Sequence, residues 1–129
     1  MIEISATFNE ARLQGVINFL SQGTDNATVE IYAAPRPSFG DPAAGSLLVT
    51  ILLAEPVGTL GAGALTLTPT PEGLILATGQ AAWARVRNGS AALAWDCDVS
   101  DLAGDGELKM PTTQLYAGGF TRIVSGSFT

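Results

Sequence analysis

The sequence predicts a mainly β fold: a two-layer antiparallel β-sandwich with one N-terminal α-helix. Most of the chain alternates apolar and polar residues with a period of two, which is typical of half-buried strands. The runs are separated by many of the 15 glycines and 7 prolines, as in folds built from many short strands. Only one segment, early in the chain, has the apolar period of a helix.

The composition predicts one folded domain covering residues 1–129. A chain of 129 residues can bury a sizeable core without disulfides or metals. Its 47% hydrophobic and 14% charged residues exclude the composition of disordered proteins. There is no run of about 18 apolar residues and no basic stretch followed by an apolar one. We therefore expect a soluble protein made in the cytoplasm.

Charge and residue types exclude several classes of function. Twelve acidic against six basic residues give a net charge of −6, which argues against nucleic acid and membrane surfaces as partners. The single cysteine, Cys97, excludes an internal disulfide. The absence of histidine removes the Ser-His-Asp and Cys-His arrangements and the common zinc sites. We expect no catalytic residue, no metal and no cofactor, and hence no enzyme.

Residues 8–21 are predicted to form the helix. Thr7 followed by Glu10 fits a capping box, and Gly23 is placed to end the helix in a left-handed conformation. The apolar stripe that would dock on a sheet consists of Leu13, Val16, Ile17 and Leu20.

About seven or eight strands are predicted after the helix. "TVEIYAA" (28–34) is a half-buried strand, and a loop with Arg36, Pro37 and Phe39 follows it. "SLLVTILLAEP" (46–56) is apolar on both faces and ends at Pro56, so its segment Leu47–Leu53 is either the centre of a sheet or a contact surface. Further strands are expected in "GALTLTP", "LILATG", "TQLYA" and "FTRIVSGSFT".

The clearest element is a hairpin in "QAAWARVRNGSAALAWDCDV" (80–99). Asn88-Gly89 predicts a two-residue type I′ turn, which would pair Ala82 with Trp95, Ala84 with Leu93 and Val86 with Ala91. One face, with Trp95, Cys97 and Val99, is predicted to be core. The opposite face carries Trp83, Arg85, Arg87, Asp96 and Asp98. That face is predicted to be either an amphipathic lid over the core edge or a subunit contact, where Trp and Arg are enriched.

The acidic stretch after the hairpin has two interpretations. Asp96 and Asp98 alternate with core residues and are expected to face solvent. The loop residues Asp101, Asp105 and Glu107 do not fit an EF-hand pattern and are expected to form a solvated turn. A looser cation site made by these three remains an alternative.

The order of several segments carries a resemblance. These are "NEARLQGVINFLSQG", "VEIYAAPRP", "LLAEPVG", "GALTLTP", "ATGQAAWARVRNGSAALAWDCDVS" and the final "SGSFT". Together they resemble a family of small proteins encoded in the virion-morphogenesis clusters of tailed bacteriophages and prophages. Some members resemble capsid cement, or decoration, proteins, which have a jelly-roll-like sandwich and bind the outside of the capsid shell.

The resemblance implies a non-enzymatic virion protein that stabilises the outer capsid shell. Its partners would be the major capsid protein and further copies of itself, and it would lie on the capsid exterior after synthesis in the host bacterial cytoplasm. The candidate interface residues are Arg36, Pro37, Phe39, Trp83, Arg85 and Arg87. Two alternatives stay open at this point: a head–tail connector or tail protein, and a carbohydrate- or calcium-binding β-sandwich module.

Overall fold

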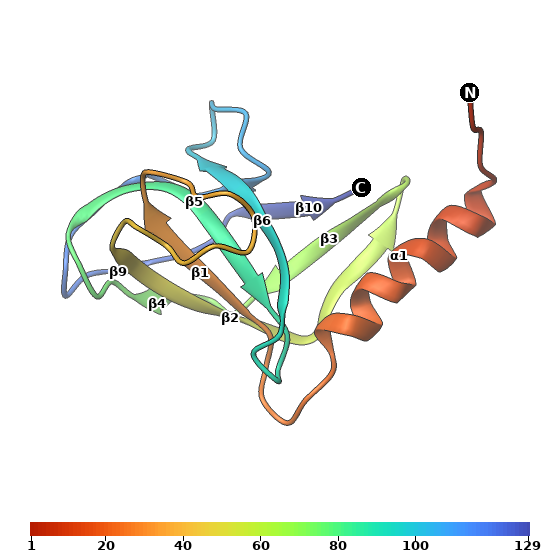
Figure 1. Ribbon diagram of the computed structural model, residues 1–129, viewed down its shortest axis with the longest axis horizontal. Helices are drawn as coiled ribbons and strands as arrows, with labels where there is room; N and C mark the ends of the chain where they lie inside the picture. Colours follow the sequence, from red (N-terminus) through yellow and green to blue (C-terminus); the bar gives the residue numbers. More distant parts are fainter.

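The computed structural model describes residues 1–129 and is mainly β with one helix (Figure 1). In chain order the elements are α1 (Ala6–Leu20), β1 (Thr28–Ala33), β2 (Leu47–Gly61), β3 (Ala64–Pro69), β4 (Gly73–Leu74), β5 (Gly79–Arg87), β6 (Leu93–Ser100), β7 (Leu108–Lys109), β8 (Gln114–Leu115), β9 (Phe120–Thr121) and β10 (Ser125–Phe128). Seven strands close into a barrel in the order β1-β2-β3-β10-β7-β6-β5 and back to β1. β8 extends the sheet from β5, and β4 pairs with β9 separately. The barrel is mixed because β6 and β7 are parallel while the other pairs are antiparallel.

The predicted two-layer sandwich is therefore wrong. Val29 of β1 lies opposite Ile51 of β2 on one side and opposite Val86 of β5 on the other, so β1 closes the sheet on itself. Alternation along a strand shows which residues share a face, but it does not show which strands are neighbours. A closed sheet and two stacked sheets produce the same pattern in the sequence.

β2 does not end at Pro56, as the sequence predicted, but continues to Gly61. Its first half pairs with β1, and residues from Gly58 onward pair with β3 after a register shift that begins at Leu53. Proline lacks a backbone donor, and an irregular point in the ladder can accommodate it. Leu47–Leu53 is mostly buried in the sheet, so it is a core segment rather than a free contact surface.

The helix begins two residues earlier than predicted. Ser5, and not Thr7, is the N-cap, and its Oγ accepts a hydrogen bond from the Phe8 backbone amide at 3.1 Å. Leu13 and Leu20 are buried against the core. Figure 1 shows α1 beside the β2–β3 hairpin, and the Asn9 side chain reaches the turn of that hairpin at the Gly63 carbonyl (3.4 Å).

The β5–β6 hairpin forms, but its register differs from the prediction by four residues. Val86 lies opposite Trp95 and Ala84 opposite Cys97. The turn is not type I′: Asn88 Oδ1 accepts hydrogen bonds from the amides of Ser90 and Ala92, both at 2.9 Å. Because these bonds hold the chain from Asn88 to Ala92 in the turn, the loop is longer than two residues. The longer loop shifts the register of the two strands.

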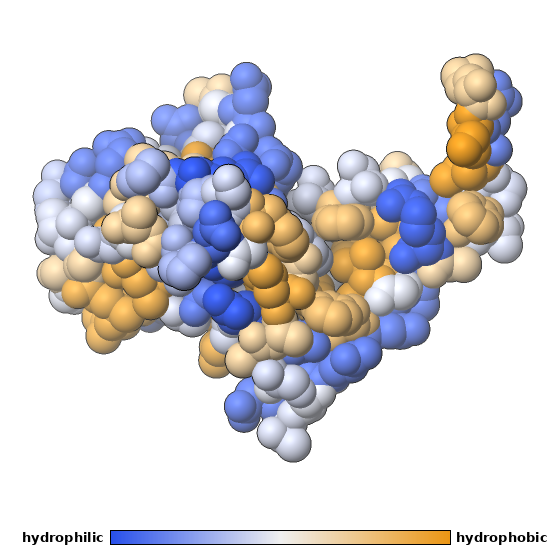
Figure 2. All heavy atoms as spheres, viewed as in Figure 1, coloured by the Kyte–Doolittle hydropathy of each residue, from blue (hydrophilic) through white to orange (hydrophobic).

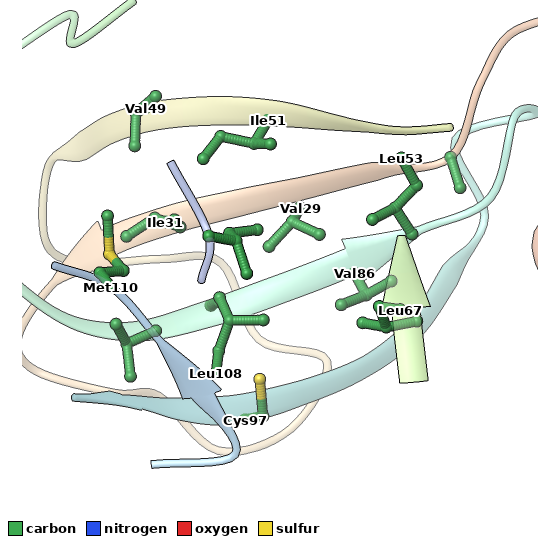
Figure 3. Packing of buried hydrophobic residues seen from close by; sticks show 14 of the residues in the cluster. Val29, Ile31, Val49, Ile51, Leu53, Leu67, Val86, Cys97, Leu108 and Met110 are labelled. Carbon is green, nitrogen blue, oxygen red and sulfur yellow. The ribbon is translucent and has the colours of Figure 1, made fainter. Parts of the chain in front are cut away.

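The barrel interior is the hydrophobic core. Figure 3 shows side chains from β1, β2, β5, β6 and β7 converging on it. Cys97 and Val99 lie in this core, as predicted. Burial raises the pKa of the Cys97 thiol to about 12, so the thiol is protonated at neutral pH.

Candidate functional site

The two residues on which the predicted contact surface centred, Trp83 and Arg85, are buried, and this corrects the expectation that their face is exposed. The chain between β1 and β2 crosses the outside of β1 and β5 and covers them (Figure 1). Trp83 stacks on Tyr32 of β1 with ring centres 4.6 Å apart, and its Nε1 donates to the Ala33 carbonyl at 3.1 Å. This face is therefore a second, smaller packed layer.

Charged residues on the same face are paired across neighbouring strands. The guanidinium of Arg85 donates from Nε and Nη2 to the two carboxylate oxygens of Asp96, at 2.8 and 3.0 Å. The expectation that Asp96 faces solvent is wrong, because none of its side chain is exposed. The hydrogen bonds that Arg85 donates to Asp96 hold the pKa of Arg85 above its ordinary value. Arg87 makes a single, partly exposed ion pair with Glu30 of β1: its Nε donates to Glu30 Oε1 at 2.9 Å. These pairs tie β1, β5 and β6 together.

The loop candidates remain at the surface. Arg36 is exposed and pairs with the exposed Asp98 at 2.7 Å, which fixes the loop over β6. Pro37 is half-buried, and Phe39 is exposed. Of the three, only Phe39 presents an unpartnered apolar side chain.

The acidic loop after β6 uses its carboxylates to close its own turns. Asp101 Oδ1 accepts hydrogen bonds from the amides of Ala103 and Gly104 at 3.0 Å. Glu107 Oε1 accepts one from the Asp98 amide at 3.4 Å. The structure gathers no group of three acidic or cysteine side chains that could hold a metal ion. The loop geometry is explained by these local bonds.

Sequence reasoning missed an apolar surface at one end of the barrel, over the small β4–β9 sheet. We call it the end patch, and it consists of Leu74, Leu76, Tyr116, Phe120 and Arg122. The four apolar and aromatic side chains are 49% to 66% exposed. Figure 2 shows apolar atoms gathered at this end, the left end of the view. Exposed apolar clusters of this kind mark interaction sites.

The backbone holds the end patch in place. Leu74 lies opposite Phe120 in the β4–β9 pair, and the amide of Leu76 donates to the Leu48 carbonyl of β2 at 2.7 Å. A hollow of about 350 Å³ lies beside Tyr116 and Phe120.

Arg122 is the one basic residue of the chain to which the structure gives no hydrogen-bond or ion-pair partner. Aromatic residues together with a free arginine are the composition of interface hot spots.

The alternation of Leu74 and Leu76 about the buried Ile75 was a usable signal in the sequence. It indicates that the two leucines share a face, but it does not show that the face is bare.

A second apolar region lies at the other end, between α1 and the barrel. It is a groove of about 480 Å³ lined by Arg12, Gly15, Val16, Phe19, Leu93, Ala94, Trp95 and Phe128. Trp95 was predicted to be core but is half-buried, and its ring packs on Phe128 with centres 4.7 Å apart. Figure 2 shows apolar atoms on both sides of the hollow between the barrel and the helix.

Comparisons of the chain with protein families, with curated proteins and with solved structures find no significant match. No helix of the structure combines the length and apolar character needed to cross a membrane.

Proposed function

We propose that the protein is a non-enzymatic structural subunit of a bacteriophage virion, and specifically a capsid cement protein. It would bind the major capsid protein on the outer face of the shell and associate with further copies of itself. One observation carries the proposal: the molecule presents two separate apolar surfaces, the end patch at one end of the barrel and the groove beside α1 toward the other end (Figures 1 and 2). The family resemblance of the sequence supports the same role.

The end patch is the surface that we assign to the capsid. Tyr116 and Phe120 offer large aromatic contact area, and Arg122 is free to pair with a carboxylate of the partner. The chain as a whole is acidic, with a net charge of −6, so the unpaired positive charge of Arg122 would also help to fix the orientation of docking.

The groove and the exposed apolar residues before α1 are the surface that we assign to self-association. Met1, Ile2 and Ile4 are 108%, 90% and 48% exposed. A subunit that stabilises a shell has to contact more than one neighbour, and surfaces at both ends of the barrel allow this.

Binding to particles tests the proposal. Particles that lack the protein are incubated with tagged wild type or with the double variant Tyr116→Ser/Phe120→Ser, and bound protein is measured after sedimentation. We expect the double variant to bind at least about tenfold more weakly, because loss of a hot-spot side chain costs about 2 kcal/mol or more. The matched control is Leu102→Ser, which removes a similarly exposed apolar side chain, 59% exposed, outside the patch.

Equal binding by wild type and the double variant would contradict the role of the end patch.

The number of copies per particle tests where in the virion the protein lies. Many copies per particle support cement, whereas a small ring of copies would place the protein at the head–tail connector or the tail and overturn the cement assignment.

A further inference from the structure

Helix α1 has a second face beside the one that packs on the core. Leu13 and Leu20 are buried against the barrel, whereas four residues of the neighbouring face are exposed or only half-buried. We call this face the outer stripe, and it consists of Phe8, Arg12, Gly15 and Phe19. Successive members are three or four residues apart, which places them on one side of the helix. This is also the spacing of the seam along which two helices pack.

The outer stripe joins an open groove to a projecting aromatic side chain. Three of its members, from Arg12 to Phe19, line the groove between α1 and the barrel. Phe8 lies one turn further toward the N-terminus and is 59% exposed. Figure 1 shows this end of α1 leading away from the barrel. The N-terminal half of one α1 is therefore placed to enter the groove of another molecule.

The outer stripe is symmetric about its own midpoint. The spacing along it is the same in both directions, so a second copy in antiparallel orientation sets each residue opposite another member of the stripe. The opposed pairs are Phe8 with Phe19 and Arg12 with Gly15. The first pair joins two aromatic rings, and the second places a long side chain against the smallest one, as interdigitated packing requires. The stripe is thus complementary to itself.

The surroundings of Gly15 and the charges allow two copies to meet here. Nothing lies within 4 Å of a Cβ added at Gly15, so that part of the helix is open. The Arg12 guanidinium is held to one side, where Nε and Nη2 donate to Asn9 Oδ1 at 3.1 and 2.7 Å. Glu10, the one acidic residue of α1, lies two positions from both Phe8 and Arg12 and hence on the opposite face. No acidic residue lines the groove. Two copies of this acidic chain can therefore meet without opposing carboxylates.

We infer that two copies form a closed dimer in which their α1 helices pack antiparallel along the outer stripe, with Phe8 of each copy in the groove of the other. The inference rests on the proposed function for self-association alone, and it requires no capsid. A second copy is the occupant because the matching pairs come from the stripe itself. The contact ends at two copies, since both use the same surface.

Analytical ultracentrifugation over a dilution series tests the dimer. We expect wild type to dimerise reversibly and Phe8→Ser to dimerise at least about tenfold more weakly, because it removes a central aromatic contact. The matched control is Leu102→Ser, since Leu102 is also 59% exposed but lies outside α1. Wild type that stays monomeric, or Phe8→Ser that dimerises as tightly as the control, overturns the inference.

Disulfide formation tests the antiparallel arrangement. Chains with Phe8→Cys and chains with Phe19→Cys are mixed, oxidised gently and analysed by non-reducing electrophoresis. Native Cys97 is retained because it is buried, and wild type controls for it. We expect the mixed disulfide to form at least about tenfold faster than one between Phe8→Cys and Gln14→Cys, which is exposed on another face of α1.

The Phe8→Cys chain alone distinguishes the two orientations. In the antiparallel dimer its two cysteines are separated by roughly 16 Å along the helix, too far for a disulfide. A disulfide between two Phe8→Cys chains that forms as fast as the mixed one would show parallel helices and overturn the inference. A mixed disulfide no faster than the Gln14→Cys control would do the same. Because these experiments contain no particles, their failure is distinguishable from failure of capsid binding.

Discussion

Arg85 of β5 and Asp96 of β6 form a bidentate ion pair with only 4% and 0% of their side chains exposed. The pair lies under the chain that joins β1 to β2 and beside the Tyr32–Trp83 stack, and the Arg85 guanidinium is 5.2 Å from the centre of the Trp83 ring. It exists because the hairpin register sets Arg85 opposite Asp96. The face with Trp83, Arg85 and Asp96, which the sequence made the main candidate for partner binding, therefore stabilises the barrel wall.

Removing one partner of this pair should strongly destabilise the fold. Asp96→Ala leaves the Arg85 charge buried without a counter-ion, which costs about 3–5 kcal/mol in the free energy of unfolding. The control is Asp98→Ala, which breaks the exposed pair with Arg36 and should cost less than about 1 kcal/mol. Urea-induced unfolding followed by tryptophan fluorescence measures both. Similar costs for the two variants would contradict the structural role of the buried pair.

The raised pKa of the Cys97 thiol predicts how the stability of the fold depends on pH. Burial, the largest cause, raises the thiol pKa from 9.0 to about 12, so the folded state holds this proton more tightly than the unfolded state does. The stabilisation is fully present below about pH 9 and is lost as the pH rises toward about 12. The pKa of Tyr32 is also raised, first by burial and then by nearby Glu30, and acts in the same direction.

Unfolding free energies at about pH 8 and about pH 11 test this dependence. Wild type should lose more stability over the interval than Cys97→Ala. An equal loss in the two proteins, or rapid reaction of folded wild type with a thiol reagent at about pH 8, would show that the thiol is not protected.

Two glycine-to-alanine changes should have opposite effects. An added Cβ at Gly89 would lie 2.0 Å from the Asp25 carbonyl oxygen, so the loop after α1 and the hairpin turn would have to separate. We expect a loss of about 1–3 kcal/mol, the usual cost of overpacking. At Gly15, in the exposed middle of α1, nothing lies within 4 Å of the added atom, and alanine should stabilise by up to about 1 kcal/mol. Thermal unfolding distinguishes the two; a neutral Gly89→Ala variant would contradict the close approach.

The sequence predicts the elements of this fold better than their arrangement. The helix, the β5–β6 hairpin and the core positions of Cys97 and Val99 follow from local periodicity, which depends on neighbouring residues alone. Barrel closure depends on the pairing of β1 with β5, and no local pattern encodes that long-range contact. Likewise, Asn88-Gly89 correctly indicated a turn, but the side-chain bonds of Asn88 set its length.

The candidate site was harder to predict for a related reason. Trp83 and Arg85 alternate with core residues in the same way that exposed residues would, but contacts with Tyr32 of β1, with Asp96 of β6 and with each other help to bury them. The end patch depends on the absence of a covering element over Leu74 and Phe120. Whether a face is covered is a property of the whole fold, so sequence periodicity could not distinguish the two surfaces.

Cryo-electron microscopy of the particle produced by the genome that encodes this chain tests the central claim most directly. We predict density for the barrel in many copies on the outside of the capsid shell, with the end patch against the shell and neighbouring copies in contact through the groove beside α1. A complete reconstruction with no barrel density on the shell, or with the barrel confined to the connector or tail, would contradict the account.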